Sequence, residues 1–229
     1  MKPIIIVPAH NEQDNILDVI SKIKLLAIDY IVINDSSFDN TALILDINDI
    51  NHIDLPCNIG IAGVVQMGFR YAVENQYDAA IVVDGDGQHP PIYIKPLLAE
   101  LEKGYDYVIG SRYLKKKKPW SMRMLGSRMI GACLFIATGK KISDPTSGMR
   151  AIGKSVLEMF AKDMNYVAEP DALAYLIRKK YQINEVQIDM DDRLSGSSYF
   201  IDPIKSIKYM TSVIISILII QLLRSSNEH

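Results

Sequence analysis

Short apolar runs that stop abruptly at polar residues are the strongest constraint on how this chain folds. These runs are Ile4–Val7, Tyr30–Ile33, Ile81–Val83 and Tyr107–Ile109. They are typical of parallel strands covered on both faces, and a helical pattern follows the first three. Strands that alternate with helices predict an α/β fold with an open, mostly parallel sheet. Ligands bind such sheets beyond the carboxyl ends of the strands, so the polar loops there form the candidate site.

The composition limits the classes of protein to which this chain can belong. The 229 residues suit one large domain, or one domain with an appendage, and are enough to bury a proper core. The formal net charge of −2 gives no electrostatic reason to expect a nucleic-acid partner. Cys57 and Cys133 lie far apart and the sequence begins without a signal-peptide pattern, so we expect a reducing, cytosolic setting.

An acidic turn follows the third apolar run. Asp84 and Asp86 stand on either side of Gly85, and Gln88 comes two residues later. Their oxygens can converge on a hard divalent cation, and Mg²⁺ or Mn²⁺ held in this way shares its coordination with water and substrate phosphates. The alternative, for these residues taken alone, is a solvated Asp-Gly turn.

The other predicted strands also end in polar loops. Asp35 can accept hydrogen bonds from a nucleobase or ribose, or it can serve as a turn or helix cap. Gly60 and Gly63 permit either close approach of the backbone to a ligand or tight helix packing. The segments 10–12 and 110–112 complete the set of loops at this edge.

Six motifs, taken in their order along the chain, are more specific than any one of them. They are Val7–Glu12, Asn34–Thr41, Asn58-x-Gly60, Asp84–Pro91, Gly110–Tyr113 and Asp144–Arg150. Together they resemble glycosyltransferase family 2, and within it the dolichol-phosphate mannosyltransferase and polyprenyl-phosphate glycosyltransferase branch, over roughly residues 4–200. The resemblance implies a GT-A fold, a Rossmann-like and mostly parallel sheet flanked by helices.

The resemblance also implies a donor site. The residues that would contact the nucleotide are Pro8, His10, Glu12, Asp35, Gly63 and Asp84. Those that would hold Mg²⁺ or Mn²⁺ are Asp84, Asp86 and Gln88. Departures from the family pattern at His10, 34–37 and Ala62 leave the base open, and a UDP-sugar is favoured over a GDP-sugar. A packed histidine without a ligand role is the alternative for His10.

Arginines indicate what kind of acceptor the protein binds. By the same resemblance, the residues that would bind its phosphate are Arg112, Arg123, Ser127 and Arg193. A guanidinium suits phosphate because its fork donates two parallel hydrogen bonds. Arg128 and Arg150 are expected to be solvated surface charges. The run Lys115–Lys118 is expected to be a solvated loop or, next to Trp120, to face anionic lipid headgroups.

The acceptor decides what catalysis requires. A sugar hydroxyl must lose a proton, and Glu169 and Asp171 fall where related hydroxyl-directed enzymes carry a base, although an acceptor-loop or structural role is the alternative for both. A lipid monophosphate, with a second pKa near ~6, is already largely anionic and needs no base. We therefore expect Asp86 and Arg112 to be catalytic, with Glu169 and Asp171 as further candidates.

The C-terminal segment is apolar. Tyr209–Leu223 is about 15 residues long, which is short for a bilayer core of ~30 Å at ~1.5 Å per residue. We expect residues 1–203 to form the GT-A domain and residues 204–229 to form an apolar helix that associates with the membrane surface. A helix that joins a homo-oligomer, or a core helix, is the alternative.

These expectations combine into one functional hypothesis. The chain is predicted to be an inverting, metal-dependent glycosyltransferase that moves a hexose from a nucleoside-diphosphate sugar to a polyprenyl phosphate at the cytoplasmic face of the cell membrane. Two alternatives remain open. One is a transferase that extends a cell-surface polysaccharide at a hydroxyl, and the other is a non-enzymatic nucleotide-sugar-binding or scaffold protein.

Overall fold

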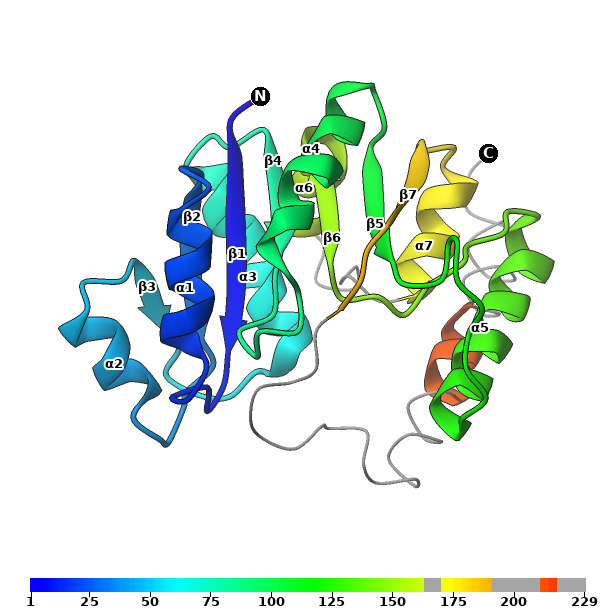
Figure 1. Cartoon of the computed structure of the whole chain (residues 1–229). Coiled ribbons are helices and arrows are strands. Elements are labelled where there is room, and N and C mark those ends of the chain that lie inside the picture. Colours follow the sequence, from blue (N-terminus) through cyan, green and yellow to red (C-terminus); the bar gives the residue numbers. More distant parts are fainter. Residues whose placement is uncertain (163–169, 191–210, 218–229) are drawn as a thin grey trace.

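A seven-stranded sheet organises the part of the chain that the computed structural model describes, residues 1–162, 170–190 and 211–217 (Figure 1). The strands are β1 (Pro3–Ala9), β2 (Asp29–Asn34), β3 (His52–Asp54), β4 (Ala79–Val82), β5 (Tyr107–Ser111), β6 (Arg150–Gly153) and β7 (Ile183–Gln187). The helices are α1 (Ile16–Lys24), α2 (Thr41–Ile47), α3 (Gly60–Glu74), α4 (Ile94–Glu102), α5 (Met122–Thr138), α6 (Lys154–Lys162) and α7 (Pro170–Arg178), and a 3₁₀ turn, η1 (Pro91–Tyr93), precedes α4.

The sheet is mostly parallel, as predicted. Its strand order is β3-β2-β1-β4-β6-β5-β7, and only β6 runs against its neighbours β4 and β5. Arg150, the first residue of β6, pairs with Val82 and with Ile109, close to the carboxyl ends of those neighbours. The loop that precedes β6 therefore lies at the same edge as the loops that follow β4 and β5.

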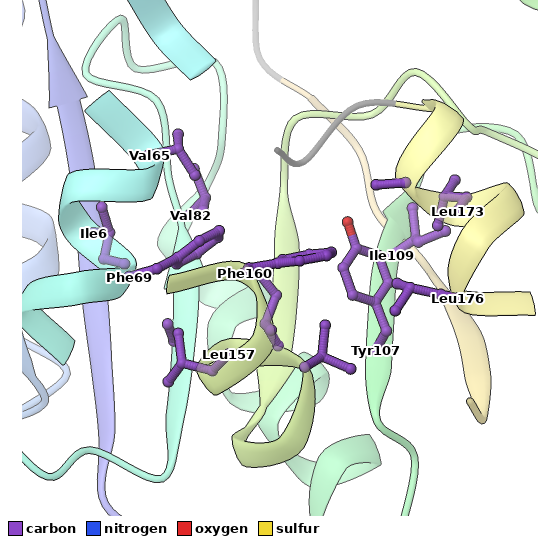
Figure 2. Close-up of a cluster of buried hydrophobic side chains, with 14 of the residues drawn as sticks. Ile6, Val65, Phe69, Val82, Tyr107, Ile109, Leu157, Phe160, Leu173 and Leu176 are labelled. Carbon is purple, nitrogen blue, oxygen red and sulfur yellow. The ribbon is translucent and has the colours of Figure 1, made fainter. Parts of the chain in front are cut away.

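Two hydrophobic clusters cover the two faces of the sheet. The strands alternate between them: Ile4 and Ile6 join the cluster under α3, α5, α6 and α7, whereas Ile5 and Val7 join the cluster under α1, α2 and α4. Phe160 lies at the centre of the first cluster, between Phe69 and Tyr107 (Figure 2). Burial on both faces explains why the central strands contain almost no polar residues.

The short strand β6 and the environment of Arg150 differ from the sequence expectation. Arg150 was expected to be a solvated surface charge, but it is only 2% exposed. Its guanidinium donates to the carbonyl oxygens of Ser147 (2.7 Å) and Pro145 (3.1 Å) and to the hydroxyl of Tyr107 (3.0 Å). Buried polar groups are stable only with such partners, and here they fasten the loop before β6 to the sheet.

The described part of the C-terminal segment, residues 211–217, is helical and packs against the domain. Val213 and Ile217 are buried in the cluster under α7. Ser216 donates a hydrogen bond to the carboxylate of Asp171 in α7 (2.7 Å). For this stretch the core-helix alternative is supported, while the rest of residues 204–229 lies outside the described residues. No helix among the described residues is long and apolar enough to cross a membrane.

Candidate active site

The acidic turn after β4 lies against the loop after β1. Gly85 donates its N–H to the carbonyl oxygen of Pro8 (3.2 Å), and a Cβ at Gly85 would come within 2.9 Å of that oxygen. Only glycine allows this approach, because a backbone oxygen cannot move aside as a flexible side chain can. The same Cβ would lie 3.6 Å from Glu12 Cγ, so the turn also adjoins the Glu12 side chain.

The acidic turn offers oxygen ligands suited to a hard cation. Asp84 and Asp86 are half-buried, and Asp86 Oδ1 accepts the N–H of Gln88 (3.0 Å). Among residues 1–162, 170–190 and 211–217, no three carboxylate, histidine or cysteine side chains gather into a complete metal site. Two carboxylates and one amide fit an ion that takes its remaining ligands from water and a diphosphate, which is how Mg²⁺ is usually held.

His89 stabilises the acidic turn through a hydrogen bond to its backbone. Its Nδ1 accepts the N–H of Asp84 (3.1 Å), so in the neutral ring the proton is on Nε2. The ring is buried, and a Cβ at Gly148 would lie 3.0 Å from His89 Cε1 and 3.0 Å from Asp84 Oδ2. His89 therefore holds the backbone of Asp84, a predicted metal ligand, in place.

The predicted nucleoside site has an exposed aromatic pair. His10 Nδ1 lies 2.8 Å from the carbonyl oxygen of Asp35, which can only accept, so Nδ1 carries the proton. Asn11 Nδ2 lies 3.1 Å from the other ring nitrogen and can donate to it. Phe38, 86% exposed, meets the His10 ring edge to face at 5.8 Å. The exposed ring faces are compatible with stacking on a base.

Asp35 and Gly63 have structural partners. The two carboxylate oxygens of Asp35 accept the N–H groups of Ile59 (2.8 Å) and Gly60 (3.0 Å), at the start of α3. This arrangement supports the helix-cap interpretation. Gly63 lies against the Ile59 side chain, since a Cβ there would be 2.8 Å from Ile59 Cδ1. Tight packing accounts for this glycine, and nucleotide contact at either residue stays a prediction.

A basic cluster lies at the end of β5. The Arg112 guanidinium forms a two-pronged pair with the fully buried Asp144, with Nε–Oδ2 at 2.6 Å and Nη2–Oδ1 at 2.8 Å. Burial opposes its charge, but the hydrogen bonds and negative charge of Asp144 outweigh burial and raise the pKa of Arg112. Arg112 Nη1 has no hydrogen-bond partner among the described residues and remains available to an anion.

Two hydroxyls extend the basic cluster. Arg112 Nη2 lies 3.4 Å from Thr146 Oγ1, and Thr146 Oγ1 lies 3.1 Å from Ser127 Oγ in α5. Lys118 Nζ donates to the same Ser127 hydroxyl at 3.0 Å. Ser127, predicted at the acceptor site, is thus linked to Arg112 through Thr146. Lys118 was predicted only as a member of the run Lys115–Lys118, and Thr146 only as part of a motif, not as members of this site.

One short loop joins the acidic turn to the basic cluster. Gly148 packs against Asp84, and Thr146, two residues earlier, contacts Arg112 and Ser127. Two residues of extended chain span at most about 7 Å. A ligand of the acidic turn and a ligand of the basic cluster would therefore lie next to each other.

The remaining predicted residues are placed differently or not described. Asp171 is the second residue of α7, and its carboxylate accepts a hydrogen bond from Ser216, which supports the structural alternative. Glu169 and Arg193 lie outside the described residues. Arg123 belongs to the first turn of α5, but its side chain is also outside the described part.

Comparison with known proteins identifies the family. Residues 4–160 match Glycosyl transferase family 2. A dolichol-phosphate mannosyltransferase from Pyrococcus furiosus is 30% identical over 86% of this chain, which spans 59% of that relative's length. A polyprenol monophosphomannose synthase from Mycolicibacterium smegmatis is 25% identical over 86% of this chain and 80% of its own. These names match the branch that the motifs resemble.

Solved structures share the fold. Glucosyl-3-phosphoglycerate synthase from Mycobacterium tuberculosis, in complex with phosphoglyceric acid, superposes with a TM-score of 0.71 and 20% identity over 96% of this chain and 79% of its own. The same enzyme with Mn²⁺, uridine diphosphate and glucosyl-3-phosphoglycerate gives 0.67 at 17% identity, over 96% of this chain and 79% of its own. The sheet described above is thus GT-A-like, and by its sequence the chain belongs to glycosyltransferase family 2.

Proposed function

We propose that this protein transfers a hexose from a nucleoside-diphosphate sugar to a polyprenyl phosphate at the cytoplasmic face of a membrane. The observation that carries the proposal is the adjacency of two oppositely charged sites: the acidic turn with Asp84 and Asp86, and the basic cluster with Arg112, joined by the loop at Gly148. The first suits a metal-bound diphosphate, and the second suits an anionic acceptor.

The chemistry then requires positioning more than proton transfer. Asp84, Asp86 and Gln88 would hold a divalent ion, which when bound neutralises the charge of the departing nucleoside diphosphate. Arg112 aligns the acceptor phosphate with the anomeric carbon. A phosphate oxygen forms the new bond to that carbon while the bond to the diphosphate breaks on the opposite face, so configuration inverts. An acceptor that is already anionic leaves no task for a base, in keeping with the pairing of Asp171 to Ser216.

A membrane location is supported by exposed apolar side chains on α5. Leu125, Met129 and Ile136 recur at helical spacing on one side of the helix and are exposed, Ile136 by 82%. Trp120, 90% exposed, lies just before this helix. An apolar stripe with an exposed tryptophan is suited to the boundary between headgroups and acyl chains.

A transfer assay tests the proposal. The full-length chain is incubated with a panel of radiolabelled UDP- and GDP-sugars, Mn²⁺ or Mg²⁺, and either polyprenyl phosphate or oligosaccharide acceptors. We expect a labelled lipid product that needs the metal and is lost in an Asp86→Ala variant. Label found only on the saccharide would refute the lipid acceptor, and donor binding without any product would refute transferase activity.

A further inference from the structure

Lys118 has a burial and a set of contacts that the function proposed above does not explain. Unlike its exposed neighbours 115–117 it is half-buried, and its ammonium reaches the hydroxyl of Ser127 (3.0 Å) and approaches the Tyr113 ring (5.6 Å to the centroid). No carboxylate lies within ion-pair distance of it in the part of the chain that the structure describes. A half-buried ammonium bonded only to a neutral hydroxyl has lost part of its water without gaining a paired counter-charge.

The backbone at Lys118 is held in place from α5. Arg128 Nη2 donates to the carbonyl oxygens of Lys118 (2.7 Å) and Pro119 (3.3 Å), and its guanidinium lies over the Trp120 ring at 4.6 Å. Arg128 Nη1 is buried and has no hydrogen-bond partner among the described residues. The sequence suggested a solvated surface charge for Arg128, but the structure uses it to fix the position of Lys118.

The local charges favour an anion. Asp144 is already paired with Arg112, and the carboxylates that act on Lys118 from a distance are Asp144 and, more weakly, Glu185, which accepts the backbone N–H groups of Ser143 and Asp144. A phosphate monoester, with a charge of about −1.5 to −2 at neutral pH, would complement the positive charge of Lys118 and Arg128. Burial lowers the pKa of Lys118, Arg112 and Arg128 lower it further, and Asp144 and Glu185 partly oppose them.

We propose that Lys118 binds the phosphate of the acceptor directly, together with Arg112 Nη1 and the hydroxyls of Ser127 and Thr146, while Arg128 positions it. The inference rests on the proposed transfer to a phosphate-bearing acceptor and adds a residue to it. The shared chemistry is a phosphate monoester, whether it comes from a lipid headgroup or from a soluble phosphate ester.

The test compares Lys118→Met with Lys140→Met. Lys140 is a matched control because it is also half-buried, its pKa is also lowered by burial, and it also donates to a neutral oxygen, the carbonyl of Ile183 (3.0 Å). With a short-chain prenyl phosphate, Lys118→Met should raise the acceptor KM about 10- to 100-fold, the range for a lost hydrogen bond between charged groups, with the donor KM within about twofold. Lys118→Arg should restore most of the binding.

Two further measurements distinguish a failure of the Lys118 site from a failure of the proposed transfer reaction. Calorimetric titration of the full chain with inorganic phosphate and with glycerol 3-phosphate reports anion binding whether or not a lipid product forms, and weakening only in Lys118→Met supports the site independently of the reaction. In the wild type, kcat/KM for the acceptor should fall with rising pH below pH 10.5, the ordinary pKa of lysine, because Lys118 loses its charge there. The Lys118→Arg profile should stay flat over the same range, because arginine does not titrate. Equal phosphate affinities in Lys118→Met and Lys140→Met would overturn the inference.

Discussion

Replacing Arg150 by methionine tests how the loop between the two sites is held. The buried guanidinium donates to Ser147, Pro145 and Tyr107, and so fastens the loop before β6 to β5. Methionine fills a similar volume but donates nothing, so two buried carbonyl groups lose a partner. We expect both lower stability and weaker coupling of the acidic turn to the basic cluster.

The magnitude follows from the three hydrogen bonds. Each bond from a charged donor contributes about 1.5–3 kcal/mol, and each orphaned buried carbonyl costs about 1–3 kcal/mol, but removing a buried charge also relieves its desolvation cost. These opposing contributions leave an expected loss of about 3 kcal/mol in the free energy of unfolding. For a chain of this size that corresponds to a fall in Tm of about 6–12 °C.

Urea unfolding followed by circular dichroism measures the loss, and two variants calibrate it. Arg70→Met removes an arginine with one hydrogen bond to a carbonyl, that of Ala161 (3.1 Å), and should cost only about 1 kcal/mol, because at this half-buried site water can replace the lost donor. Tyr107→Phe removes a single acceptor of Arg150 and should fall between the two. If Arg150→Met were no more destabilising than Arg70→Met, the buried hydrogen bonds would not hold the loop and the reasoning would fail.

Three further predictions concern the acidic turn, the core and Asp39, which lies just before α2. Gly148→Ala should push Asp84 away from its position, because the added Cβ would lie 3.0 Å from Asp84 Oδ2, and should raise the Mn²⁺ concentration needed for donor binding about 10- to 100-fold in a thermal-shift titration. Phe160→Ala should lower the free energy of unfolding by about 3–5 kcal/mol, because the fully buried ring stacks on Phe69 at 5.9 Å; Phe160→Leu should cost clearly less in the same urea assay. Burial alone would raise the pKa of Asp39, but hydrogen bonds from Thr41 and Gln13 outweigh burial and lower that pKa below the ordinary value of 3.8. The stability that ionised Asp39 contributes is therefore fully present above pH 3.8 and is lost as the pH falls through the lowered pKa. The stability difference between the wild type and Asp39→Asn should therefore shrink in unfolding curves taken at decreasing pH, and a constant difference would contradict this assignment.

The parallel part of the fold was predictable because each central strand is covered on both faces. Runs such as Ile4–Val7 and Ile81–Val83 contain only apolar residues, and the helices that follow them show a periodic apolar side. The strand β6 was not predicted, because its four residues begin with an arginine and lead directly into α6. Its place depends on pairing with β4 and β5, which local sequence does not encode.

The sequence of α5 interleaves basic and apolar residues, and no helix was predicted there. Ser121 accepts the N–H of Met124 at its start, and Gly139 adopts a positive φ of 72° at its end, so the capping residues were readable signals. Its apolar residues, however, include exposed ones such as Ile136 as well as buried ones such as Leu134, which obscures a single buried stripe.

Individual residues of the candidate site were predictable by type, but their partners were not. The sequence pointed to Asp84, Asp86 and Arg112 because carboxylates and arginines follow predicted strands. The pairing of Arg112 with Asp144 joins residues 32 positions apart and depends on how the loop before β6 folds back. The distinction between Lys118 and three adjacent lysines likewise arises only from burial against α5.

The antiparallel direction of β6 affects how the sequence of this protein can change during evolution. Because β6 is antiparallel to β4 and β5, the heptapeptide Asp144–Arg150 enters the sheet at the edge where those two strands end, and it contacts both the acidic turn and the basic cluster. Under the proposed function, an insertion in this heptapeptide would change the distance between the donor and acceptor sites, whereas a substitution of Ser127 in α5 would change only the acceptor site. If the proposal holds, the choice of acceptor and the geometry of transfer depend on separate stretches of the polypeptide.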